Sequence, residues 1–465
     1  MKKILVLIST FLLFTALTAC SGDNQAGGEQ LEENGNYVEN VAVSSENDIH
    51  ETGETTISPY EQIRLDVLAD FDFLVEELEA NMPLYGVLYR RLGIDFAVLL
   101  AGVRERILTE DIFDGTLEDV EQMERAAADF LFAALQRMSI PLGGIGHLAP
   151  FSYDMYLGYL VYLKRLQTES PEEFSPIMQS WLEVFAHPAA LWFYGVDMDE
   201  LDLDDEGVSM LGADRNAIRT SIISPREIAL VSIRHAMNTL DFDRETLYPF
   251  FEEIQNYEHL IIDLSEHSGG YTIHFRELIL SPLLSVPVQV EGHEFFMDGD
   301  RTQRYLELLL LQYDEAGNKA HVHDAVEFVT ARNMMYFNQY DLETLAWVFE
   351  YSYMIEPIKD GFPFGGRIWI LTGERTASAG ELAILQASST GFATTVGAPT
   401  QGIMPAESSY ILLPNTGIIF RMDLSYFTDT DGRSLEEFGI TPDYPNHPNR
   451  TAFQTVLEMI ESGYY

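Results

Sequence analysis

Residues 367–387 read RIWILTGERTASAGELAILQA, and this stretch decides the fold. The apolar run 367–372 is typical of a buried strand, and the segment after Ser378 has the composition of a helix. A turn of small residues joins the two, so Ser378 is predicted to stand at a helix N-terminus. Unpaired N–H groups and the helix dipole favour a developing negative charge at that place. A serine there is either a nucleophile or an ordinary helix cap.

Strands and helices alternate through the second half of the chain. Residues 228–233 and 260–264 are predicted strands with a helix at 245–257 between them, and a strand at 393–396 follows the helix predicted at 379–389. This alternation implies an α/β fold, in which helices cover a parallel-rich sheet. Ligands bind such sheets beyond the carboxyl ends of the strands, which is where the serine lies.

The N-terminus has the pattern of an export signal. Met1-Lys2-Lys3 is positively charged, residues 4–14 are mostly apolar, and residues 17–20 read LTAC. The apolar run is too short to span a membrane, which favours a secretory signal. LTAC resembles the lipobox of bacterial lipoproteins, where the signal is cut before a cysteine that becomes lipidated; the alternative is an ordinary signal with an incidental cysteine. We therefore expect an extracytoplasmic protein that is anchored to a bacterial membrane by lipid on Cys20, the only cysteine.

Composition separates a tether from a globular part. Residues 21–57 are rich in Gly, Asn, Ser and Glu, and are predicted to form a disordered tether. The remaining residues, about 400, are enough for two or more domains. The net charge of −47 argues against nucleic acid or anionic lipid as a surface partner, because both need a basic footprint.

Helical patterns dominate the start of the globular part. Ser58-Pro59 is a good helix start, and apolar residues recur at helical spacing up to Leu78. Further helices are predicted at 95–109 and 117–138. The predicted division is residues 1–20 as signal, 21–57 as tether, 58–150 as an N-terminal helical domain, 151–225 as a connecting region of uncertain structure, and 226–465 as the catalytic domain.

Four ordered segments resemble those of the tail-specific (C-terminal processing) serine proteases. They are 260–270, ending in Ser268-Gly269-Gly270; 376–381; 396–402, which reads VGAPTQG; and 435–443, which reads LEEFGITPD. The resemblance covers residues 226–446 and implies a crotonase-like α/β core. The preceding helical region, with DFDFL at 70–74 and Gly146-His147, resembles the helical domain of the tricorn-type branch.

The resemblance implies a set of catalytic roles. In the lysine-dyad branch of the family the general base would stand at position 403, but Ile403 cannot accept a proton. The tricorn-type branch instead takes a histidine from the helical domain and a glutamate from the last segment, and these positions match His147 and Glu436. Ser378 is then the nucleophile, His147 the general base and Glu436 the orienting carboxylate.

The resemblance also implies an oxyanion hole, and two departures from the family bear on the site. The oxyanion donors would be the N–H of Ala379 and one from Gly269 or Gly270. The turn at 265–267 reads Ser-Glu-His where the family usually has Arg-Gly-Asn, which makes His267 a second candidate base. Gly146 stands where tricorn has a relaying serine, which leaves the orientation of His147 open.

These features predict a serine endopeptidase that acts on peptides or proteins through an acyl-enzyme and needs no metal or organic cofactor. The acidic run 197–206 and the pair His321 and His323 are interpreted as exposed loops, because ligand spacing or a third ligand is missing. The alternative is a binding module of the same fold that holds a peptide or an apolar ligand without effective chemistry.

Overall fold

The computed structural model describes residues 57–112, 119–171, 174–203, 216–236, 239–406 and 408–463. The predicted signal, lipobox Cys20 and nearly all of the tether lie outside the described residues. Within these ranges, every helix falls short of the length or apolar character that a membrane crossing needs.

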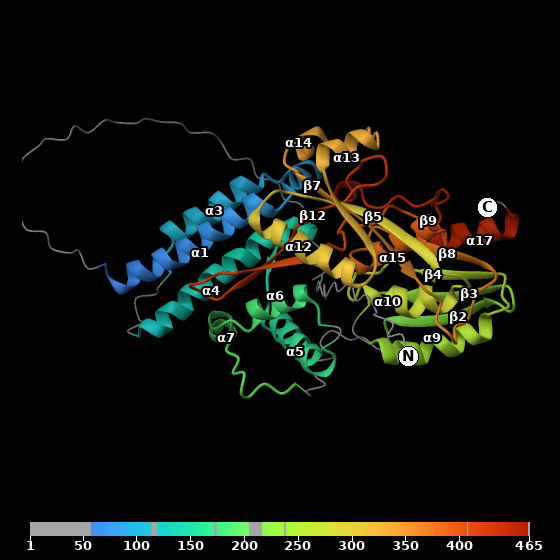
Figure 1. Cartoon of the computed structure of the whole chain (residues 1–465), viewed down its shortest axis with the longest axis horizontal. Helices are drawn as coiled ribbons and strands as arrows, with labels where there is room; N and C mark the ends of the chain where they lie inside the picture. Colours follow the sequence, from blue (N-terminus) through green and yellow to red (C-terminus); the bar gives the residue numbers. More distant parts are fainter. Residues whose placement is uncertain are drawn as a thin grey trace, which may run out of the picture.

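The first half of the globular part is helical (Figure 1). Ser58 caps the first helix by accepting a hydrogen bond from the Glu61 N–H at 3.3 Å, as its position before Pro59 predicts. The region 151–225, which the sequence left unassigned, begins with three helices. The elements in chain order are α1 (Pro59–Asn81), α2 (Tyr85–Leu92), α3 (Phe96–Thr109), α4 (Val120–Ser139), the 3-10 turns η1 (Ile140–Leu142) and η2 (Ile145–His147), the short strand β1 (Ala149–Pro150), α5 (Tyr153–Glu169), α6 (Pro176–Phe185) and α7 (Pro188–Tyr194).

A six-stranded sheet confirms the predicted α/β arrangement. Its order is β13-β9-β8-β4-β3-β2, and only β2 runs antiparallel to its neighbour. Helices α9 and α15 pack on one face and α17 on the other. The elements are β2 (Ile218–Ser224), β3 (Ile228–Ile233), α9 (Leu240–Ile254), β4 (His259–Asp263), β8 (Arg367–Thr372), α15 (Ala379–Thr390), β9 (Thr394–Gly397), β13 (Tyr444–Pro445) and α17 (Ala452–Ser462). Helix α9 begins five residues before the predicted start, and Thr239 precedes it.

A second, antiparallel sheet is built mostly from the part of the chain between β4 and β8, although these two strands pair directly in the first sheet. Its order is β12-β5-β7-β6, and Figure 1 shows its long strands crossing the middle of the molecule. The elements are α10 (Ile273–Phe275), the π-helical turn η3 (Arg276–Leu280), α11 (Ser281–Leu283), β5 (Val288–Phe296), α12 (Asp300–Glu315), β6 (Lys319–Asp324), α13 (Ala325–Ala331), α14 (Gln339–Leu342), β7 (Trp347–Ile355) and β12 (Ser425–Tyr426).

A small third sheet joins the two halves of the chain. Strand β1 pairs with β11 (Ile419–Asp423), which forms a hairpin with β10 (Ser408–Leu412); the short helix α16 (Leu435–Phe438) follows. One hydrophobic core contains Phe71 of α1, Phe349 of β7 and Phe420 of β11. The N-terminal helices therefore share a core with the later strands, and this shared core fixes the position of η2.

Candidate active site

Ser378 occupies the predicted place between β8 and α15. Its backbone has φ 51° and ψ −116°, a conformation that non-glycine residues rarely adopt and that costs about 1–3 kcal/mol. The Ser378 N–H donates to the Ile403 carbonyl at 2.7 Å, which helps to hold this turn. Within the described chain, the Ser378 side chain accepts no capping hydrogen bond from α15. The ordinary capping role therefore does not account for this serine.

The turn around Ser378 is tightly packed. Thr376 donates its hydroxyl to the Leu264 carbonyl at 2.8 Å and accepts the Gly373 N–H at 3.0 Å. A Cβ on Gly380 would lie 2.8 Å from the His267 ring. A glycine is therefore needed two residues after the serine, because the loop that follows β4 presses against the start of α15.

His147 forms a buried pair with Asp423. Its Nδ1 lies 2.6 Å from Asp423 Oδ2, and both side chains are nearly inaccessible to solvent. Since an ionised Asp423 can only accept, Nδ1 carries the proton and Nε2 keeps its lone pair. Among the described residues, Nε2 has no hydrogen-bond partner although it is buried. The arrangement therefore leaves a basic nitrogen with unused hydrogen-bonding capacity.

The pairing of β1 with β11 sets the register of this contact. Ala149 lies opposite Arg421, so two residues earlier His147 comes level with Asp423. Asp423 also accepts the Ser408 hydroxyl at 2.9 Å, and Ser408 in turn accepts Arg421 Nε at 2.6 Å. The carboxylate is thus held from the side opposite the imidazole.

Burial lowers the pKa of His147 below its usual 6.5, and the nearby Arg421 lowers it further, while Asp423 acts in the opposite direction. The imidazole is therefore neutral at neutral pH. A neutral histidine with a free Nε2 lone pair can accept a proton.

The prediction that Glu436 orients the histidine is wrong. Glu436 is buried, but its two oxygens accept the Phe427 N–H at 2.8 Å and the Ser434 hydroxyl at 3.2 Å. Asp423 contacts the histidine instead. The available signal was an acidic residue in the buried strand 419–423, whose other members are apolar except Arg421.

The two glycines after β4 have different roles. The Gly269 N–H donates to His267 Nδ1 at 3.1 Å, so the prediction of Gly269 as an oxyanion donor is not supported by its bonding. In the described structure, neither the Gly270 nor the Ala379 N–H has a protein partner. A Cβ on Gly270 would lie 1.7 Å from the Ala236 carbonyl oxygen, so only glycine fits there.

His267 is unsuited to be the base. Its Nδ1 accepts a hydrogen bond, so Nε2 carries the proton of the neutral ring. Burial, with a smaller effect from His274, lowers its pKa to about 3. Its carbonyl accepts the Ala377 N–H at 2.9 Å, which indicates a structural role beside the serine turn.

A buried acid and an arginine support the serine turn from behind. Glu381 accepts the Gly402 N–H at 2.6 Å, and burial raises its pKa to about 8. Arg91 of α2 donates to the carbonyls of Gly402 at 3.1 Å and Glu436 at 2.5 Å, and also to that of Gln401. These bonds fix the loop whose Ile403 carbonyl holds Ser378.

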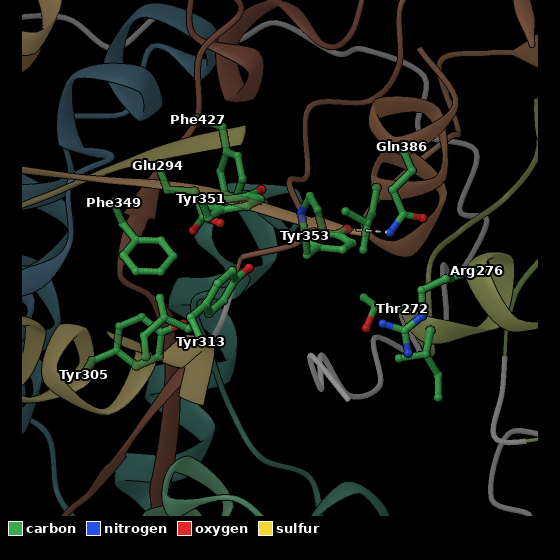
Figure 2. A pocket seen from close by; sticks show the side chains of 14 residues that line it. Thr272, Arg276, Glu294, Tyr305, Tyr313, Phe349, Tyr351, Tyr353, Gln386 and Phe427 are labelled. Atoms are coloured by element: carbon green, nitrogen blue, oxygen red, sulfur yellow. Dashed lines mark hydrogen bonds between the residues drawn. The ribbon is translucent and has the colours of Figure 1, made fainter. Parts of the chain in front are cut away.

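A pocket lies beside α15 (Figure 2). We call it the aromatic pocket, because six of its lining side chains are Tyr or Phe. About 50 Å³ of it is open to water-sized molecules. Its lining residues are Thr272, Ile273, Arg276, Glu294, Tyr305, Leu309, Tyr313, Phe349, Tyr351, Tyr353, Leu382, Gln386, Pro405 and Phe427.

The described residues contain no group of three or more His, Cys, Asp or Glu side chains that could hold a metal ion. The interpretation of His321 and His323 as an exposed loop is wrong, because both lie in strand β6. His323 Nε2 lies 3.0 Å from Glu350.

Comparison with known proteins supports the interpretation of this chain as a peptidase. Residues 228–446 match Peptidase family S41. This match supports the tail-specific protease family and, through it, a serine-type peptidase that acts on peptides or proteins. No curated protein matches the chain.

Several solved structures are similar at low sequence identity. Mature CPAF complexed with lactacystin is 14% identical, with 86% of this chain and 98% of that chain covered and a TM-score of 0.46. A lipoprotein from Streptococcus agalactiae is 13% identical, with 85% and 96% covered and a TM-score of 0.41. The photosystem II D1 C-terminal processing protease is 12% identical, with 50% and 46% covered and a TM-score of 0.30.

Proposed function

We propose that this chain is an exported, lipid-anchored serine endopeptidase with Ser378 as nucleophile, His147 as general base and Asp423 as the carboxylate that positions the base. The observation that carries this proposal is the buried His147–Asp423 pair, which leaves Nε2 with its lone pair free of any described partner. An imidazole held in this way is prepared to take a proton from a hydroxyl.

The reaction would proceed in two halves. Ser378 Oγ attacks the peptide carbonyl while His147 Nε2 takes its proton, and Asp423 stabilises the imidazolium that forms. The N–H groups of Ala379 and Gly270 would receive the developing oxyanion. His147 then returns the proton to the leaving amine as the C–N bond breaks. Water next attacks the acyl carbon while His147 Nε2 takes its proton, and this proton passes to Ser378 Oγ as the acid product leaves.

The structure has no hydrogen bond between Ser378 Oγ and His147 Nε2. Catalytic hydrogen bonds often form only when substrate is bound, so this does not argue against the pair.

A fluorophosphonate probe tests the proposal directly on the full chain. We expect covalent labelling of the wild type, and no labelling of Ser378→Ala or His147→Ala variants that unfold at the wild-type temperature. Equal labelling of wild type and Ser378→Ala would refute the nucleophile. An unlabelled but folded wild type would favour a binding module.

The anchor is tested in a bacterial host. Lipid on Cys20 should place the wild-type chain in the membrane fraction, and Cys20→Ser should move it to the soluble extracytoplasmic fraction. Recovery of both forms in the membrane would show that Cys20 is not the anchor.

A further inference from the structure

The aromatic pocket is lined by close sequence neighbours of Ser378, Gly270 and Ile403. Leu382 and Gln386 follow Ser378 by four and eight residues, so they lie on the same face of α15 as the serine. Thr272 follows Gly270 by two residues, and Pro405 follows Ile403 by two. A side chain next to the scissile bond of a bound peptide would therefore enter this pocket.

The pocket has one carboxyl group, on Glu294 of β5. Figure 2 shows Glu294 beside Phe349, Tyr351 and Phe427. Among the described residues, no Lys, Arg or His is paired with this carboxyl. Arg276 lies at the opposite end of the view with Thr272 and Gln386, and its Nε donates to Glu277 at 3.0 Å. In the described part of the chain, the carboxyl therefore has the Ser425 hydroxyl as a hydrogen-bond partner and no basic side chain as a counter-ion.

The rings around Glu294 suit a cation. The face of an aromatic ring attracts a positive charge, and the attraction is stronger when the contact is desolvated. Tyr351 and Tyr353 stack at 6.2 Å between centroids, and Tyr353 accepts a hydrogen bond from Gln386 at 2.9 Å. These contacts fix the rings before any ligand binds.

Burial raises the pKa of Glu294 to about 7, and the nearby Asp423 contributes to the increase. A substrate cation would stabilise the ionised form. An apolar side chain would leave the ionised carboxyl with the Ser425 hydrogen bond alone and without a counter-ion. The chain's net charge of −47 would also attract basic substrates.

We propose that the aromatic pocket takes a cationic side chain of the peptide substrate, with Glu294 as its counter-ion and the aromatic rings around it. The inference rests on the proposed function, because it names the substrate class of the same site. Lysine serves as the cationic side chain in the test, because its ammonium is a compact point charge.

The test measures binding separately from hydrolysis. A Ser378→Ala full-length chain is titrated with fluorescent acetyl-Ala-Ala-Lys-Ala-Ala-amide and with the analogue that has norleucine in place of lysine. We expect the lysine peptide to bind about tenfold more tightly, as one desolvated ion pair predicts. Equal or tighter binding of the norleucine peptide would overturn the proposal without any further variant.

The role of Glu294 is tested in the same background. Glu294→Gln should bring the lysine-to-norleucine ratio close to one. Glu291→Gln is the matched control, because it removes the same charge from an exposed position of the same strand and should keep the ratio. An unchanged ratio in a folded Glu294→Gln variant would rule out Glu294 as the counter-ion.

Fluorophosphonate labelling of the wild type then separates the two proposals. Labelling without a lysine preference would support the proposed peptidase and refute the proposed lysine specificity. A lysine preference without labelling would support the cation-binding pocket and refute the proposed peptidase activity.

Discussion

At the scale of the residue, two carboxyl groups are candidates for the carboxylate that orients His147. Asp423 contacts the imidazole at 2.6 Å, whereas Glu436 is bonded to Phe427 and Ser434. Both acids are buried, so burial alone does not identify the functional one. The two acids differ in their hydrogen-bond partners, and only Asp423 contacts the imidazole.

Replacing each acid by its amide distinguishes them. Asp423→Asn should lower the rate of fluorophosphonate labelling by about 10⁴, because the amide can donate to Nδ1 and so stabilise the wrong tautomer. Glu436→Gln should label close to the wild-type rate, since burial raises the pKa of Glu436 well above 4.5 and the neutral acid resembles an amide. The reverse pattern of rates would return the orienting role to Glu436.

The pH dependence of labelling reports on the base. The lowered pKa of His147 means that the imidazole is already neutral below pH 6.5. The labelling rate should therefore rise with pH at an apparent pKa below 6.5 and stay constant from pH 7 to 8. A rate that still rises between pH 7 and 8 would contradict His147 as the base.

At the scale of the element, the β10–β11 hairpin carries Asp423 and is held by the first helix. Asp70 of α1 accepts hydrogen bonds from the N–H and side chain of Asn415, both at 3.0 Å, and from the N–H and hydroxyl of Thr416 at 2.7 and 2.6 Å. The helical region thus positions both members of the pair: η2 carries the histidine, and α1 clamps the hairpin turn.

Removing this clamp should destabilise the protein. Asp70→Ala leaves buried donors without partners, and we expect a loss of about 3 kcal/mol in the free energy of unfolding, measured with urea. Asp72→Ala, on the same helix, breaks only the exposed pair with Arg104 and should cost far less than Asp70→Ala. Similar losses in both variants would show that the hairpin turn does not depend on Asp70.

At the scale of the whole molecule, buried acids and buried histidines change the stability of the fold in opposite directions as the pH rises. Burial raises the pKa of Glu381 to about 8 and that of Glu294 to about 7, so their folded forms keep protons that the unfolded chain releases above pH 4.5. Their contribution to stability falls as the pH rises through this window. Burial lowers the pKa of His267 to about 3, so its contribution rises with pH up to 6.5 and is then constant.

These signs predict a stability that declines above pH 6.5. Between pH 6.5 and 8.5 the acids titrate in the folded state while the histidines no longer change, so the urea midpoint should fall. The urea midpoint of Glu381→Gln should fall less over the same pH range. The midpoint of the exposed control Glu291→Gln should fall as much as that of the wild type. A midpoint that is constant with pH would mean that these acids are ionised in the folded chain.

The sequence by itself determined the parallel-rich sheet and the helix that starts after Ser378. Apolar periodicity, small-residue turns and caps act over a few residues, so they can be recognised without knowing the rest of the structure. The buried run at 367–372 and the capped start at Ser58 are examples, and both appear in the structure at the predicted residues.

Only the tertiary structure decided which acid meets His147 and which glycine keeps a free N–H. Asp423 is 276 residues away from the histidine, and the contact depends on the register between β1 and β11. Strand pairing over such a separation follows from how the whole core packs, and no local pattern encodes it. The sequence therefore predicted that the candidate site has a serine, a histidine and a carboxylate. The pairing of distant strands decided that the carboxylate beside the histidine is Asp423.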